Sequence, residues 1–149
     1  RGTARPVNPP GRGQDPSFSM PGVAQQIARI EKGLDEPVLR AGNLDAERDL
    51  SDVRDVVDGY AVIAERGSPG EAYNVCSGAA HRIGDLLERL LSRSRVRIRV
   101  EQDESRMRPI ELPRLVGDNG RLRGLGWSPR ISVDQMLNDV LDYWRKKVG

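Results

Sequence analysis

The 149-residue sequence contains one cysteine, one histidine and one phenylalanine, and these low numbers exclude several classes of protein. A single thiol, Cys76, cannot form an internal disulfide, so a disulfide-stapled fold is excluded and a reducing cytoplasmic setting is expected. Because His81 is the only histidine, a zinc-ligand cluster and a cysteine–histidine nucleophile pair are both disfavoured. We therefore interpret Cys76 as a core residue of a strand and His81 as a surface residue.

Long hydrophobic runs and an excess of charge of one sign are also missing. A membrane-spanning helix needs about 18 consecutive apolar residues, and the sequence has no such run, so no membrane partner is expected. The 24 basic and 22 acidic residues leave a net charge of +2, which argues against a nucleic-acid-binding protein. Arg93, Arg95, Arg97 and Arg99 form the one basic stretch, and we interpret it as the solvated side of an edge strand.

The beginning of the sequence carries no initiator methionine and no signal peptide. We therefore expect the chain to be cut from a larger protein, or to lack its first part. The following segment, residues 9–16, is rich in proline and glycine. Proline removes backbone donors and fixes φ, so this segment is expected to be an irregular loop, which in a compact domain is usually functional or disordered.

Hydrophobic periodicity predicts four helices and three strands, and their alternation indicates an α/β fold. The helices are expected over 23–34, 53–64 with Ser51 as N-cap, 83–91 and 136–144, and a short fifth helix over 119–125. For the last long helix, the sequence predicts a capping box from Ser132 to Gln135 and a hydrophobic staple from Ile131 to Met136. The strands are expected over 38–40, 73–76 and 96–100. In the third strand, Val96, Ile98 and Val100 are predicted to face the core.

Two patterns resemble functional motifs but lack the context that would support them. Gly11-Arg12-Gly13 does not lie between a predicted strand and a predicted helix, so it is not interpreted as a phosphate-binding loop. Tyr143 and Lys147 have the Tyr-x-x-x-Lys spacing of the dehydrogenase dyad and would share one face of a helix. They lie at the end of the chain without an upstream serine or a dinucleotide-binding half. We interpret them as ordinary helix residues.

Two arginines in predicted loops, Arg48 and Arg108, are open to two interpretations. A guanidinium in a loop is most often solvated. It can also meet a diphosphate with two parallel hydrogen bonds. Composition and periodicity alone leave both interpretations open.

Five collinear motifs resemble the extended short-chain dehydrogenases, and in particular the GDP-mannose 4,6-dehydratases and GDP-4-keto-6-deoxy-mannose reductases. They cover nearly the whole chain. They are Arg5-Pro6-x-Asn8 with a Gly/Pro loop to Gln14, Gly42-Asn43-Leu44-Asp45-Ala46-x-Arg48-Asp49 with Asp52-Val53-Arg54-Asp55, Tyr73-Asn74-Val75-Cys76-Ser77-Gly78, Arg108-Pro109-x-Glu111-x-Pro113 with Gly117-Asp118-Asn119, and Leu125-Gly126-Trp127-x-Pro129. The second and third motifs look more like the reductases than the dehydratases.

The resemblance implies the C-terminal half of a Rossmann-type α/β enzyme, mostly its small substrate-binding domain. Residues 1–8 and 50–78 would pack on a missing N-terminal dinucleotide-binding domain. Residues 9–49 and 79–149 would form the part that binds the sugar nucleotide. The catalytic Ser/Thr, the true Tyr-x-x-x-Lys and the glycine-rich cofactor loop lie upstream in this family, so no catalytic residue is expected in this chain.

The resemblance also implies a set of substrate-binding residues. The asparagine matching Asn8 contacts the sugar nucleotide, the arginines matching Arg48 and Arg108 bind its diphosphate or ribose, and the glutamate matching Glu111 contacts the nucleoside end. Asn43 and Gln25 complete the predicted set. Gln25 stands where relatives carry a lysine near the base, and Pro9-Pro10-Gly11-Arg12-Gly13 replaces the usual Gly-Pro-Gly.

The resulting expectation is the sugar-nucleotide-binding half of an NAD(P)-dependent GDP-sugar reductase in the cytoplasm, inert as this chain alone. NAD or NADP is expected for the full-length enzyme, and a GDP-sugar is the expected ligand. The resemblance implies that a homodimer of the full-length enzyme would form through the missing half, so this chain says little about self-association. Two alternatives stay open. One is the corresponding half of a 4,6-dehydratase or a 4-epimerase. The other, of a different class, is a non-catalytic binding or interaction module.

Overall fold

A computed structural model describes residues 3–6, 19–106 and 113–149. The chain divides into two compact units. Unit 1 comprises residues 1–13, 47–81 and 114–132, and unit 2 comprises residues 14–46, 82–113 and 133–149. Among the described residues, no helix is both long and apolar enough to cross a membrane.

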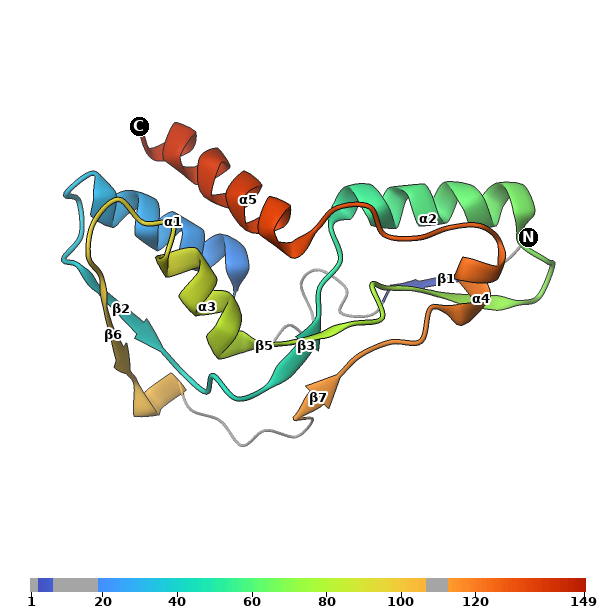
Figure 1. The fold of residues 1–149 in the computed structure, drawn as a ribbon, viewed down its shortest axis with the longest axis horizontal. Helices are drawn as coiled ribbons and strands as arrows, with labels where there is room; N and C mark the ends of the chain where they lie inside the picture. Colours follow the sequence, from blue (N-terminus) through green and yellow to red (C-terminus); the bar gives the residue numbers. More distant parts are fainter. Residues whose placement is uncertain (1–2, 7–18, 107–112) are drawn as a thin grey trace. The chain divides into compact units, whose positions relative to one another are not determined.

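Unit 1 contains a parallel strand pair that is covered by a helix. Strand β1 (Thr3–Pro6) pairs with β4 (Ala72–Val75), with Thr3 opposite Ala72. Helix α2 (Val53–Arg66) runs along these strands, as Figure 1 shows, and the short helix α4 (Gly120–Gly124) contacts β4. The apolar core of this unit is formed by Ile63, Tyr73, Val75, Leu122 and Trp127.

A second small sheet contains three strands in the order β5-β3-β7. The central strand β3 (Glu47–Asp49) pairs in parallel with β7 (Arg114–Leu115), with Arg48 opposite Leu115. Strand β5 (Ala80–Arg82) lies on its other side. This sheet therefore carries one of the predicted substrate-binding residues, Arg48, at its centre.

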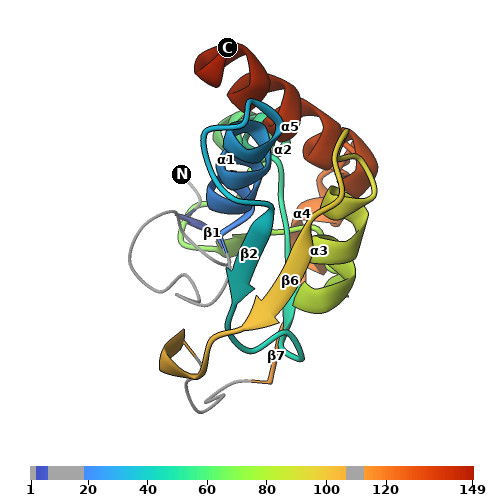
Figure 2. The same ribbon diagram turned by 90° about the vertical axis from the view of Figure 1, so that its left-hand side faces the viewer.

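Unit 2 is a parallel strand pair with three helices on one face. Strand β2 (Val38–Ala41) pairs with β6 (Arg99–Gln102), and Figure 2 shows the two arrows side by side in front of the helices. These helices are α1 (Met20–Glu31), α3 (Ile83–Leu91) and α5 (Val133–Val148), and a short 3-10 turn, η1 (Glu104–Arg106), follows β6. The core consists of Val23, Ala24, Ile27, Leu39, Ala41, Leu87, Leu90, Leu137 and Leu141.

The five predicted helices are present, and the structure corrects details of α1 and α2. Helix α1 ends at Glu31, so Leu34, which was predicted to continue its apolar stripe, lies beyond the helix and is 56% exposed. The N-cap of α2 is Asp52 rather than Ser51, since the helix begins at Val53 and the Asp52 carboxylate accepts the Arg54 N–H at 2.8 Å. The buried face of α2 consists of Asp55, Gly59 and Ile63. Most of the predicted apolar stripe points elsewhere: Val53, Val57 and Tyr60 are exposed, whereas Val56 packs against the core of unit 1.

The structure also corrects the third predicted strand. Strand β6 begins at Arg99, where its pairing with β2 begins, and not at Val96. Of the three residues predicted to face the core, Ile98 packs against it, whereas Val96 and Val100 are exposed. The helices bury Leu39 and Ala41 of β2 instead.

Candidate functional site

Arg48 is the predicted site residue that the structure describes on a strand. It occupies the middle of β3 and is half-buried. Its Nη1 donates to the backbone carbonyl of Glu47 at 2.8 Å, which holds the guanidinium beside its own strand. A guanidinium carries five N–H donors in a rigid fork, so this geometry is compatible with binding a phosphate or carboxylate.

Asn43 and Gln25 belong to unit 2, whereas Arg48 belongs to unit 1. Asn43 is half-buried in the segment after β2, and its Oδ1 accepts the Asp45 N–H at 3.0 Å, so the side chain shapes this turn. Gln25 lies exposed on α1. The other three predicted residues, Asn8, Arg108 and Glu111, lie outside the described part of the chain.

The prediction missed a buried carboxylate directly after Arg48. Asp49 is 2% exposed and ends β3. Its Oδ1 accepts the Ser77 N–H at 3.0 Å and the Ser77 hydroxyl at 2.6 Å, and its Oδ2 accepts the N–H groups of Gly78 and Gly117 at 2.9 and 3.3 Å. The available signal was the residue type, because aspartate is depleted in strands and an aspartate in a strand needs a local explanation.

A second buried polar residue organises the neighbouring turn. Asn119 is 7% exposed, and its Nδ2 donates to the Cys76 carbonyl at 2.9 Å. Gly78 has a φ of 78°, and a Cβ there would lie 3.2 Å from Asn119 Nδ2. The turn after β4 therefore requires glycine at position 78, both for its backbone conformation and for the space beside Asn119.

The two residues with reactive side chains, Cys76 and His81, lie close to their predicted places: Cys76 directly follows β4 instead of lying in it, and His81 lies on β5. Cys76 is buried, and burial, with a smaller effect of the nearby Asp49, raises the pKa of its thiol to about 11, so the thiol is protonated at neutral pH. His81 is half-buried. Among the described residues, no group of three or more histidine, cysteine or acidic side chains is arranged to hold a metal ion.

Tyr143 and Lys147 do not form a proton-transfer arrangement. Tyr143 is 55% exposed on α5, and Lys147 Nζ lies over the face of its ring, 5.9 Å from the centroid. The ring of Trp144 meets that of Tyr143 edge to face at 5.3 Å. The ammonium thus interacts with the π face of Tyr143, as expected for ordinary surface residues of a helix.

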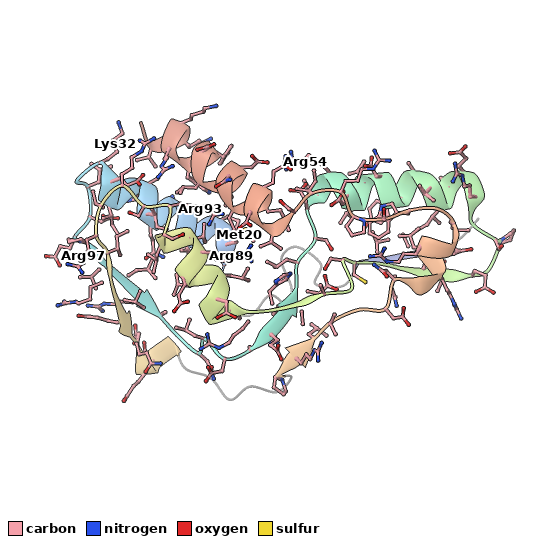
Figure 3. The ribbon with its side chains drawn as sticks, in the orientation of Figure 1. Met20, Lys32, Arg54, Arg89, Arg93 and Arg97 are labelled. Atoms are coloured by element: carbon pink, nitrogen blue, oxygen red, sulfur yellow. The ribbon has the colours of Figure 1, made fainter. Side chains whose placement is uncertain are left out.

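Some arginines of unit 2 form ion pairs that connect helices, and others lie exposed on the surface. Figure 3 labels Arg89 and Arg93, which both bind Asp134 of α5, at 2.6 and 2.8 Å. Arg99 pairs with Glu101 at 2.7 Å, and Arg97 is exposed. Arg95, Arg97 and Arg99 are exposed as predicted, but only Arg99 lies on strand β6. Arg93 was predicted wrongly, because its side chain is only 21% exposed and pairs with Asp134 of α5.

A cavity of about 650 Å³ opens on unit 2, and it contains none of the predicted site residues. Its lining includes Arg40, Arg99 and Glu101 on the strands, with Gln26 and Asp35 beside them. Asp35 is paired with Arg29 at 2.9 Å, and Arg99 with Glu101. The charges on its wall are therefore largely compensated by one another, and we do not assign the site to this cavity.

Comparison with known sequences identifies relatives that act on GDP-sugars. A sequence profile of the GDP-mannose 4,6 dehydratase family matches residues 3–140. The chain is 40% identical over 146 residues to the GDP-6-deoxy-D-mannose reductase of Pseudomonas aeruginosa, which covers 97% of this chain and 48% of that protein. By contrast, it is 23% identical over 139 residues to the GDP-mannose 4,6 dehydratase of Homo sapiens, covering 80% of this chain and 37% of that protein.

Solved structures show the same relationship. The structure of RMD from Pseudomonas aeruginosa complexed with NADPH superimposes with a TM-score of 0.86 at 38% identity, over 98% of this chain and 48% of that chain. A putative epimerase from Burkholderia cenocepacia has a TM-score of 0.74 at 32% identity, over 97% of this chain and 46% of that chain. The chain thus spans about half the length of the relatives that it matches.

The fold agrees with these matches. The mixed α/β structure with parallel strand pairs is that of a Rossmann-type extended short-chain dehydrogenase, as predicted from the motifs. The profile covers most of the chain, and the agreement of sequence and structure extends over nearly its whole length. The chain therefore belongs to the GDP-mannose 4,6 dehydratase family.

Proposed function

We propose that this chain forms the sugar-nucleotide-binding side of an NAD(P)-dependent GDP-sugar reductase and is catalytically inert by itself. The observation that carries the proposal is the much greater similarity to a GDP-6-deoxy-D-mannose reductase than to the dehydratases. The longer protein would reduce the 4-keto group of a GDP-6-deoxy-hexose. In this proposal the present chain holds the nucleotide end still, which supplies orientation to the reaction.

Arg48 is the described residue that we propose to contact the diphosphate. Its position on a paired strand restricts the backbone, and its half-burial reduces competition from water. An arginine in such a position meets phosphate oxygens through charge-assisted hydrogen bonds. Asn8, Arg108, Glu111, Asn43 and Gln25 complete the proposed site on the strength of the family motifs.

The described residues do not fit a complete dinucleotide site. A dinucleotide-binding fold places a glycine-rich turn between a strand and a helix, whose N-terminus faces the pyrophosphate. The described strand-to-helix connections carry no such turn, because Asp52 caps the N-terminus of α2 and Arg82 of β5 directly precedes α3. The sequence contains no Gly-x-Gly-x-x-Gly. We therefore assign the nicotinamide cofactor to the longer protein, with an N-terminal dinucleotide-binding half as the partner of this chain.

The experiment that tests the proposal is a titration of the chain with GDP, followed by two-dimensional NMR, which detects weak binding. A partly desolvated arginine–phosphate contact contributes about 1.5–3 kcal/mol. Arg48→Ala should therefore weaken GDP binding by roughly tenfold to more than a hundredfold.

The matched control is Arg97→Ala, which removes the same charge from an exposed position of unit 2 and should leave the affinity unchanged. An unaltered affinity in Arg48→Ala would reject the proposed site. The absence of any GDP-induced shift in the unmodified chain would reject the binding function itself.

A further inference from the structure

Asp49 lies at the point where three separate segments of unit 1 meet. Two of its hydrogen-bond partners, Ser77 and Gly78, follow β4, and the third, Gly117, follows β7. They are 28, 29 and 68 residues away in the sequence. One carboxylate therefore connects the ends of β3, β4 and β7.

Because Asp49 is buried, its carboxylate must be compensated by well-placed hydrogen-bond donors. Moving an ionised carboxylate out of water is costly unless hydrogen bonds compensate it. Its four hydrogen bonds place two donors on each oxygen, and three of those donors are backbone N–H groups that cannot be reoriented without moving the chain. The position of the carboxylate thus fixes the backbone at the end of β3.

Arg48 is the residue whose position depends most directly on this anchor. Successive side chains of a strand point to opposite faces, so burial of Asp49 directs Arg48 to the other face of β3. Pairing with β7 adds to the restriction, since Arg48 lies opposite Leu115 and Gly117 binds the carboxylate two residues further on. The backbone at Arg48 is therefore restrained both by the Asp49 carboxylate and by the pairing of β3 with β7.

We propose that Asp49 is a positioning residue for nucleotide binding, which holds the end of β3 so that Arg48 meets the diphosphate of the GDP-sugar. The inference rests on the function proposed above, because it gives Asp49 a role only if Arg48 contacts the nucleotide. Asp49 itself points into the protein and does not touch the ligand.

The variant that tests this role is Asp49→Asn. An amide has one acceptor oxygen, so in either orientation its NH₂ group faces donors that now bind a carboxylate oxygen. The end of β3 must then shift. Loss of a residue that orients a metal ligand costs roughly 10–100-fold in metal affinity. By analogy we expect GDP binding to weaken by about the lower end of that range.

The chain offers a matched control in Asp55→Asn. Asp55 is also 2% exposed, belongs to the same unit, and accepts two backbone N–H groups, those of Arg130 and Ile131, both at 3.0 Å. It lies on α2 and has no contact with the Asp49 cluster among the hydrogen bonds described. Both variants should lower the melting temperature of the chain, but only Asp49→Asn should weaken GDP binding.

The outcomes separate the inference from the function on which it rests. Weaker binding in Asp49→Asn and Arg48→Ala, with unchanged affinity in Asp55→Asn, supports the positioning role. Unchanged affinity in Asp49→Asn, or equal weakening in both aspartate variants, overturns that role while leaving the effect of Arg48→Ala intact. If Arg48→Ala has no effect, the proposed function fails and the inference fails with it.

A second variant keeps the test decisive if Asp49→Asn does not fold. Ser77→Ala removes the hydroxyl donor at 2.6 Å and leaves the backbone donors in place. Its NMR spectrum should retain the dispersion of a folded chain, and its GDP affinity should fall by less than that of Arg48→Ala. An affinity equal to that of the unmodified chain would overturn the inference.

Discussion

Glu31 and Arg145 form an ion pair in which both side chains are largely covered, with 6% and 19% of their surfaces exposed. Both Glu31 oxygens accept from the Arg145 guanidinium at 2.8 Å, and the Arg95 N–H adds a third donor at 2.8 Å. The hydrogen bonds of the Arg145 side chain hold the pKa of the Glu31 carboxyl below its usual value. The pair connects the ends of α1 and α5 within unit 2.

Glu31→Gln should lower the free energy of unfolding by about 1–3 kcal/mol, between the values for exposed pairs and fully buried pairs. The reason is that Arg145 keeps its charge but loses its partner. Urea unfolding measures the difference. The control is Asp142→Asn, because Asp142 is 64% exposed and lies 3.8 Å from the same guanidinium, so its loss should have almost no effect. Equal losses of unfolding free energy in both variants would contradict the assignment of Glu31 as the main partner of Arg145.

The same pair predicts a pH dependence. Since the pKa of Glu31 is lower in the folded chain than in the unfolded chain, its stabilisation is present above the usual value of 4.5 and is lost as the pH falls through the folded value. The difference in unfolding free energy between the unmodified chain and Glu31→Gln should therefore be constant near neutral pH and shrink below about pH 4.5. A difference that grows on acidification would show that folding raises the pKa of Glu31 instead of lowering it.

The sequence predicted one residue of the candidate site and missed its immediate neighbour. Arg48 could be predicted because it belongs to a motif with recognisable spacing. The role of Asp49 could not, because its donors lie 28 to 68 residues away and no local pattern brings them together. Three other predicted residues, Asn8, Arg108 and Glu111, lie outside the described residues and stay predictions.

At the scale of elements, helices followed from periodicity, whereas the shortest strands did not. Strands β3, β5 and β7 contain three, three and two residues, too few for alternation to be detected. The face of α2 was predicted wrongly because counting apolar residues passes over Gly59 and Asp55, which the structure buries. Glycine is buried there because the absence of a side chain lets the helix approach β4 closely.

Gly59→Ala tests this close approach. A Cβ at position 59 would lie 2.9 Å from Val75 Cγ1, closer than real Cβ contacts allow, and 3.3 Å from Leu122 Cδ2, which is tighter than most such contacts. Alanine favours a helix by roughly 1 kcal/mol over glycine, but overpacking costs typically about 1–3 kcal/mol. We expect a net loss of stability in urea unfolding. Asp58→Ala on the exposed side of the same helix is the control and should be close to neutral; a gain in Gly59→Ala would refute tight packing.

The exposed apolar face of α2 leads to a prediction about association. Val53, Val57 and Tyr60 are 71%, 56% and 40% exposed, and contiguous apolar patches usually mark a contact surface. We predict that the isolated chain binds a hydrophobic dye or self-associates, and that Val53→Gln combined with Val57→Gln reduces both. Leu34→Gln, at a 56% exposed position of unit 2, serves as the control. A monodisperse chain without dye binding would contradict this prediction.

For the whole molecule, we predict that the chain does not turn over substrate. The residues that could imitate a dehydrogenase dyad, Tyr143 and Lys147, are arranged with the ammonium over the ring. Incubation with NADPH and a GDP-4-keto sugar should leave the absorbance of the reduced nicotinamide unchanged relative to a heat-inactivated sample. Tyr143→Phe is the control if a signal is seen, since activity that disappears in this variant would show that the dyad is functional.

Each unit is assembled from three separate stretches of the chain, and this arrangement affects how the protein is made. The core of unit 2 combines α1 from the first stretch, α3 from the second and α5 from the third. During synthesis, α1 and α3 leave the ribosome before Leu137 and Leu141 exist to cover them. The core of unit 2 can therefore close only after α5 has been translated, and a nascent chain must keep apolar surface exposed until then.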